Sequence, residues 1–86
     1  MRHITDARLD GIDTLLDQLR AIDGLTERKR GVFYRKSKAF LHFHEDGDDV
    51  YADVRLDGVE FDRRRVSTNT EQRALVRAVL RAIRDR

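Results

Sequence analysis

Apolar residues recur every three or four positions near the start of the chain, which is the spacing of one stripe of a helix. They are Leu9, Ile12, Leu15, Leu16, Leu19 and Ile22. Thr5 or Asp6 can cap the beginning of this helix, and Gly24 can end it in a left-handed conformation. Residues 25–31 show no periodicity, so we expect a linker there.

Polar and apolar residues alternate after this linker, as in strands that bury one face. The pattern predicts four strands, at residues 32–35, 39–45, 50–56 and 59–63. The pair Asp57-Gly58 lies between the last two. This pair favours a two-residue type I′ hairpin turn, because both central positions of that turn need a positive φ.

A second helix is predicted near the end of the chain. Thr68 and Glu71 have the spacing of a capping box, in which each side chain accepts a hydrogen bond from the other's backbone N–H. The apolar stripe that follows consists of Leu75, Ala78, Val79, Ala82 and Ile83. The sequence shows no boundary to a second domain, so we expect residues 1–86 to form a single domain.

The predicted turns decide which side chains share a face of the sheet. A two-residue turn at 57–58 pairs Asp53 with Asp62, and a four-residue loop at 46–49 pairs His42 with Asp53. The two registers agree, because together they separate apolar from polar positions. The apolar face contains Ala39, Leu41, Phe43, Val50, Ala52, Val54, Leu56, Val59 and Phe61. The other face contains Phe40, His42, His44, Tyr51, Asp53, Arg55, Glu60 and Asp62.

A two-residue turn at Lys36-Ser37 adds Phe33 to this second face, opposite Phe40. Both helices can then pack only on the apolar face. We therefore expect an α+β fold, a two-layer sandwich of helix, four-stranded antiparallel meander and helix, with both helices on one face of the sheet. The candidate binding residues lie on the open face: Phe33, Phe40, His42, His44, Tyr51, Asp53, Arg55 and Asp62.

Charge and composition limit the classes of partner. The 18 Lys and Arg residues nearly balance the 16 Asp and Glu residues, so the net charge of +2 does not by itself favour a polyanion. The chain has no Cys, which excludes a disulfide framework and a thiolate metal site. No apolar run approaches the roughly 20 residues that span a bilayer, and no signal-peptide core is present. We expect a cytoplasmic protein without a membrane partner.

Two histidines carry the first candidate chemistry. His42 and His44 lie two apart on one strand, so both point to one side, where Asp53 neighbours His42. Imidazoles and a carboxylate can hold a divalent metal ion. The alternative, which we favour from the sequence, is a pair of surface histidines, because this spacing is common and His3 lies on an untethered terminus.

The like charges of Asp53 and Asp62 would favour the charged form of His42. This arrangement could work as a general acid/base pair. No nucleophile, oxyanion donor or Gly-rich phosphate loop accompanies it. The sequence therefore leaves enzymatic activity open without favouring it, and we expect no cofactor. Arg55 and Glu60 are expected to form an ordinary cross-strand ion pair.

Phe33 and Phe40, flanked by basic residues at 35–38, resemble a nucleic-acid platform on which bases stack. Basic triplets at 28–30 and 63–65 would extend such a surface. Acidic residues on the same face oppose this interpretation. The alternative is that these basic triplets are solvated charges in loops.

Aromatic residues on an uncovered sheet also fit a protein-interaction face, most simply a two-fold contact between copies. We favour this interpretation, a small non-enzymatic binding module that self-associates as a homodimer or binds another protein. A nucleic-acid-binding domain comes second. A metal-dependent or acid/base enzyme that uses His42, His44 and Asp53 comes third.

Two segments carry a resemblance to other proteins. They are GVFYRKSKAFLHFHED at residues 31–46 and YADVR at residues 51–55. Together they resemble small bacterial proteins of unknown function from actinobacterial-type genomes. This resemblance implies no activity, cofactor or partner.

Overall fold

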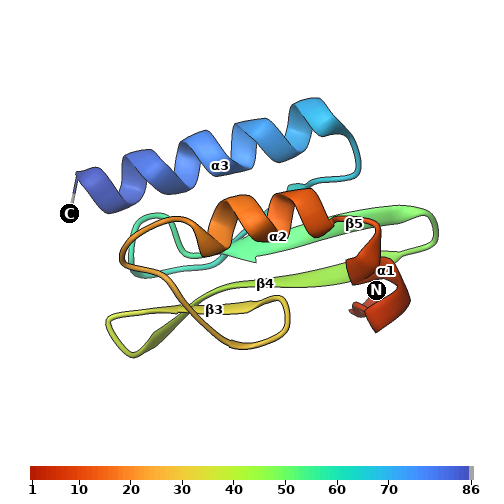
Figure 1. Ribbon diagram of the computed structural model, residues 1–86, viewed down its shortest axis with the longest axis horizontal. Helices are drawn as coiled ribbons and strands as arrows, with labels where there is room; N and C mark the ends of the chain where they lie inside the picture. Colours follow the sequence, from red (N-terminus) through yellow and green to blue (C-terminus); the bar gives the residue numbers. More distant parts are fainter. Residues whose placement is uncertain (86) are drawn as a thin grey trace.

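The computed structural model describes residues 1–85 and shows an antiparallel sheet with helices packed against it (Figure 1). The α+β class is therefore confirmed. The expected count of four strands and two helices is wrong, because the described chain forms six strands and three helices. They are, in order, β1 (Arg2–His3), α1 (Asp6–Asp10), α2 (Asp13–Arg20), β2 (Thr26–Lys29), β3 (Val32–Arg35), β4 (Lys38–Asp46), β5 (Asp49–Val54), β6 (Asp62–Arg65) and α3 (Asn69–Arg84).

The strands run in the order β2-β3-β4-β5-β6, and β1 pairs with β4 off this path. Every pairing is antiparallel. The first apolar stripe divides into α1 and α2 at Gly11, where the cap N–H of Gly11 bonds back to Arg8. The predicted capping box of Thr68 and Glu71 is present at the start of α3.

The linker expected at residues 25–31 is wrong, since this segment contains β2 and the turn into β3. Glu27 accepts a hydrogen bond from the backbone N–H of Gly31 at 2.9 Å and from Arg20 Nε at 2.6 Å. Gly31 has φ +78°, and a Cβ there would lie 2.9 Å from Leu9 Cδ2. Strand β2 is held by ion pairs and a glycine turn rather than by an apolar face, so it leaves no period-two pattern in the sequence.

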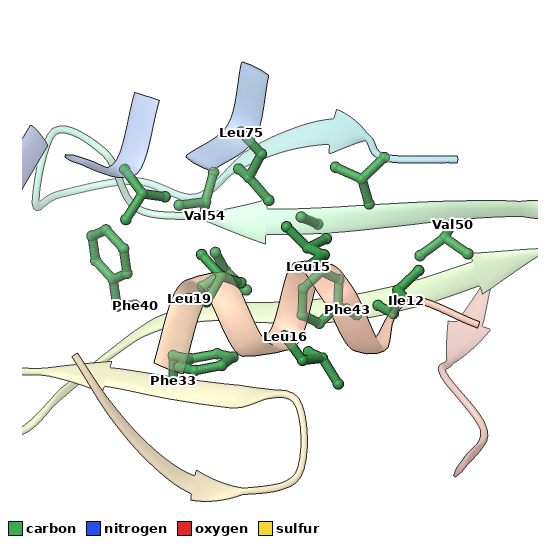
Figure 2. Close-up of a cluster of buried hydrophobic side chains, with 14 of the residues drawn as sticks. Ile12, Leu15, Leu16, Leu19, Phe33, Phe40, Phe43, Val50, Val54 and Leu75 are labelled. Carbon is green, nitrogen blue, oxygen red and sulfur yellow. The ribbon is translucent and has the colours of Figure 1, made fainter. Parts of the chain in front are cut away.

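The placement of Phe33 and Phe40 on the open face is also wrong. The turn at 36–37 has two residues, as expected, but a bulge follows it and Phe33 pairs with Leu41. One extra residue on β4 reverses the alternation beyond the bulge. Phe33 and Phe40 are consequently buried, with 0% and 3% of their surfaces exposed, and both join the core (Figure 2).

The register between β4 and β5 is confirmed. Leu41 pairs with Val54, and His42 pairs with Asp53. The pairing of His44 is likewise the predicted one, with Tyr51. Alternate residues of these two central strands therefore enter the core, while the histidines and Asp53 lie on the other side.

The prediction of a two-residue turn at Asp57-Gly58 is wrong. The Asp57 carboxylate accepts hydrogen bonds from the backbone N–H groups of Val59 and Glu60 at 2.8 and 3.0 Å, which stabilises a wider loop across residues 55–61. Glu60 follows this turn instead of pairing with Arg55, so the expected ion pair has no cross-strand register to support it.

The wider loop shifts the register of β6. Asp53 pairs with Arg63 rather than with Asp62, which lies opposite Val54. This register replaces a like-charge neighbour by an opposite charge, which is the more stable cross-strand pair. Phe61, expected in the core, lies in the loop with 39% of its surface exposed.

Side chains of α2, α3 and the sheet form one core (Figure 2). Its largest fully buried members are Phe33, Leu15, Leu16, Leu19, Leu41, Leu75, Val54, Val66 and Val79. No helix within residues 1–85 combines the length and apolar character needed to cross a membrane.

Candidate functional site

Two histidines of the chain approach one carboxylate, and the third stacks on one of them. His42 and His44 come from β4, Asp53 comes from β5, and His3 comes from β1, where it pairs with His44. Cross-strand partners project to the same side of a sheet. We call His3, His42, His44 and Asp53 the histidine cluster.

The cluster is tightly packed. Nε2 of His44 lies 3.1 Å from Asp53 Oδ2, and Nε2 of His42 lies 3.4 Å from the same oxygen. The rings of His3 and His44 stack with their centroids 5.2 Å apart, and those of His42 and His44 meet edge-on at 5.0 Å. Only 11% of the Asp53 side chain is exposed, so the imidazoles cover a carboxylate that is largely removed from water.

Arg63 neutralises this carboxylate. Its Nε donates to Asp53 Oδ1 at 2.8 Å, and a terminal nitrogen donates to Oδ2 at 3.0 Å. These hydrogen bonds hold the pKa of Asp53 below its usual range, although burial acts in the opposite direction. Asp62, the residue expected at this position, is instead paired with Arg64 at 3.0 Å. Asp62 therefore does not belong to the cluster.

The expectation that His42 favours its charged form is wrong. Burial lowers the pKa of His42, and this effect exceeds the attraction of Asp53. The Arg63 guanidinium and the other two imidazoles act on the pKa of His42 in the same direction as burial. A neutral imidazole keeps a lone pair on one ring nitrogen, which is the form that binds metal ions.

His3 is held in place through a buried carboxylate on the helix-covered side of β4. Glu45 is 4% exposed and accepts hydrogen bonds from Arg2 Nε at 3.2 Å and from the backbone N–H of Thr5 at 3.3 Å. Arg8 Nε lies 3.3 Å from its other oxygen. The expectation of an untethered terminus is therefore wrong. A strand of two residues is too short to show any period in the sequence.

The ligand geometry suits a small divalent ion. His42, His44 and Asp53 each offer one ligand atom, and these three atoms lie within 4.8 Å of one another. A zinc ion with bonds of about 2.0–2.1 Å places tetrahedral ligands roughly 3.3 Å apart. The two nitrogen–oxygen distances of 3.1 and 3.4 Å are close to that separation.

An aromatic residue that the sequence analysis assigned to the core lies beside the cluster. The ring of Phe61 meets His42 edge-on, with centroids 5.1 Å apart, and the guanidinium of Arg55 lies 4.2 Å from the centre of the same ring. Tyr51 is half-buried opposite His44. The sequence analysis missed Phe61 because it assumed a two-residue turn. The longer loop after Val54 takes Phe61 out of the strand pairing.

Of the predicted open-face residues, the structure brings together His42, His44 and Asp53, with Tyr51 and Arg55 nearby. It removes Phe33, Phe40 and Asp62. The resemblance to small bacterial proteins stays an expectation. No protein-family model matches the chain, and no curated protein or solved structure shows significant similarity to it.

Proposed function

We propose that this domain binds a divalent transition-metal ion through His42, His44 and Asp53, with His3 beside them as a further ligand. The observation that carries the proposal is the approach of His42 and His44 to one largely buried carboxylate, with His3 stacked on His44. A set of imidazoles with one carboxylate suits zinc and neighbouring ions, while magnesium and calcium prefer oxygen ligands.

A metal ion would take the place of the Arg63 guanidinium at Asp53. Arg63 lies on an edge strand and half of its side chain, 51%, is exposed. It can therefore swing into solvent when a second positive charge arrives. Exchange of one cation for another keeps the carboxylate neutralised in both states, which avoids the cost of an unpaired buried charge.

Solvent can reach the cluster from one side. A cavity of about 440 Å³ lies next to it, and His3 and His42 are among the residues that line this cavity. An ion could enter by this path without opening the core. The proposed role is that of a non-enzymatic binding module.

Self-association and nucleic-acid binding stay predictions with less support than before. Both interpretations assumed that the rings of Phe33 and Phe40 are exposed, whereas both rings are buried. The edge strands β2 and β6 contain TERK and DRRR. Charged edges discourage pairing between copies.

The test is a Co²⁺ titration of protein without a histidine tag, followed by competition with Zn²⁺. Visible absorption of bound Co²⁺ reports its coordination. We expect saturation at one ion per chain, and a loss of affinity of at least about tenfold for His44→Gln or Asp53→Asn.

Asp62→Asn is the matched control. It removes one carboxylate charge, as Asp53→Asn does, but Asp62 pairs with Arg64 and lies outside the cluster. Its affinity should equal that of the original chain. The proposal is overturned by non-saturable binding, or by equal affinities for the Asp53 and Asp62 variants.

A further inference from the structure

A second cavity, of about 270 Å³, lies where the turn between β3 and β4 approaches the loop after β5. Figure 1 shows both segments at the same end of the sheet. Four cationic side chains line it, from Arg35, Lys36, Lys38 and Arg55. No carboxylate lines it within residues 1–85, so the cavity concentrates positive charge in a chain whose net charge is small.

Arg55 is held rigidly at this cavity. Its guanidinium lies over the ring of Phe61, and its backbone N–H donates to the carbonyl of Phe40 at 2.8 Å. The Nε atom of Arg55 is buried and has no hydrogen-bond partner in the described chain. A buried donor without a partner is unfavourable, so an acceptor brought by a ligand would stabilise this side chain.

The turn that supplies two of the cations has an unfavourable backbone. Lys36 and Ser37 have φ values of 51° and 68°, in the left-handed region where a two-residue turn of this kind prefers Asn-Gly. Strain of this kind is found at ligand-binding positions more often than elsewhere. At this turn, the strained residues place a lysine at the rim of the cavity.

The remaining lining is apolar, from Ala39, Phe40 and Gly58. A ligand here would contact cationic side chains on one part of its surface and apolar side chains on another. The volume is near the lower end of small-molecule pockets. A single phosphate group with a small organic part fits this combination of size and charge better than an extended polyanion, which would need a longer basic track.

We propose that this cavity binds a small phosphate monoester, with Arg55 and the lysines at 36 and 38 contacting the phosphate. Arg suits this role because its fork of N–H donors matches phosphate oxygens. The cavity shares no lining residue with the histidine cluster, so the two proposals can fail separately.

The experiment uses phenyl phosphate and inorganic phosphate as probes, with the amide chemical shifts of the full chain as readout. We expect saturable shifts confined to residues 35–40 and 55–61, with phenyl phosphate the tighter ligand because of the apolar lining. Lys38→Met and Arg55→Met should each weaken binding about tenfold, the value of one charge-assisted hydrogen bond. Arg77→Met, on the exposed surface of α3, is the matched control and should change nothing.

Arg55→Lys addresses the case in which Arg55→Met fails to fold, since it keeps the charge and removes the fork. A selective loss with Arg55→Lys supports the proposal. Shifts that stay linear to roughly 10 mM ligand, or an equal loss in the Arg77 control, overturn it. Binding of a single-stranded oligonucleotide without binding of either phosphate probe would also overturn it and assign the charge to a nucleic-acid surface.

Discussion

The guanidinium of Arg63 contacts both carboxylate oxygens of Asp53, at 2.8 and 3.0 Å. The oxygen at 3.0 Å is also the one approached by Nε2 of His42 and of His44. Asp53 Oδ2 is therefore shared by a half-exposed guanidinium and two imidazoles. This geometry makes Arg63 a competitor of any metal ion bound at the cluster.

Removal of that competitor should strengthen metal binding. We expect Arg63→Gln to raise the affinity for Co²⁺ by roughly threefold to tenfold, because the carboxylate loses its alternative counter-charge. Arg64→Gln is the matched control, since Arg64 is adjacent on β6 and pairs with Asp62. An unchanged or lower affinity for Arg63→Gln would contradict competition between the two cations.

Glu45 should act as a positioning residue for His3. We expect Glu45→Gln to weaken the ion pairs with Arg2 and Arg8, loosen β1 and lower the metal affinity severalfold without changing His42 or His44. Hydrogen exchange at residues 2–5 should accelerate in the same variant. Asp46→Asn, at the exposed neighbouring position, is the control. Faster exchange with unchanged affinity would show that His3 is not a ligand.

The aromatic residues should differ sharply in their effect on stability. We expect Phe33→Ala and Phe40→Ala each to lower the free energy of unfolding by roughly 3–5 kcal/mol, because both rings are buried in the core. Phe61→Ala should cost about 1 kcal/mol or less, since its ring is partly exposed in a loop. Urea denaturation measures all three. Similar values for Phe61 and Phe40 would contradict the bulge in β4.

The ion pair of Arg20 with Glu27 should make stability depend on pH. The hydrogen bonds from Arg20, opposed in part by burial, hold the pKa of Glu27 below its ordinary value of about 4.3. The carboxylate therefore stabilises the fold above that value, and the contribution is lost as the pH falls through the lower, folded-state pKa.

Glu27→Gln should accordingly be less stable than the original chain at pH 6, with the difference shrinking as the pH falls toward about 3. The free energy of unfolding from urea titrations at several pH values gives the comparison. Glu60→Gln, at an exposed loop position, is the control. A difference that stays constant with pH would remove Glu27 as a contributor.

Self-association through the open face can be tested on revised residues. The loop before β6 exposes two apolar side chains, Val59 and Phe61, with 73% and 39% of their surfaces exposed, and Phe61 contacts His42 of the open face. We expect any dimer to dissociate in Phe61→Arg, while Leu80→Arg, on the exposed surface of α3, leaves the mass unchanged. Sedimentation at tens of micromolar protein decides. A monomer in the original chain ends the interaction proposal.

The sequence by itself determined the α+β class, the start of the last helix and the register between the two central strands. These features depend on local periods and caps, such as the alternation through His42 and His44 and the box formed by Thr68 and Glu71. Because β4 and β5 bury one face each, a slip of one residue would exchange core and solvent positions. The pairing of His42 with Asp53 follows from that constraint.

Only the tertiary structure decided what surrounds this pair. Three features leave no periodic signal in the sequence. They are the bulge that buries Phe40, the turn stabilised by the Asp57 carboxylate, and the two-residue strand that contains His3. The two-residue strand depends on a contact between residues far apart in the chain, that of Glu45 with Arg2. The turn depends on local hydrogen bonds to the Asp57 carboxylate, which the alternation of polar and apolar residues does not show. The position of Arg63 at Asp53 depends on this loop, because a loop stabilised by one carboxylate sets the register of the whole edge strand.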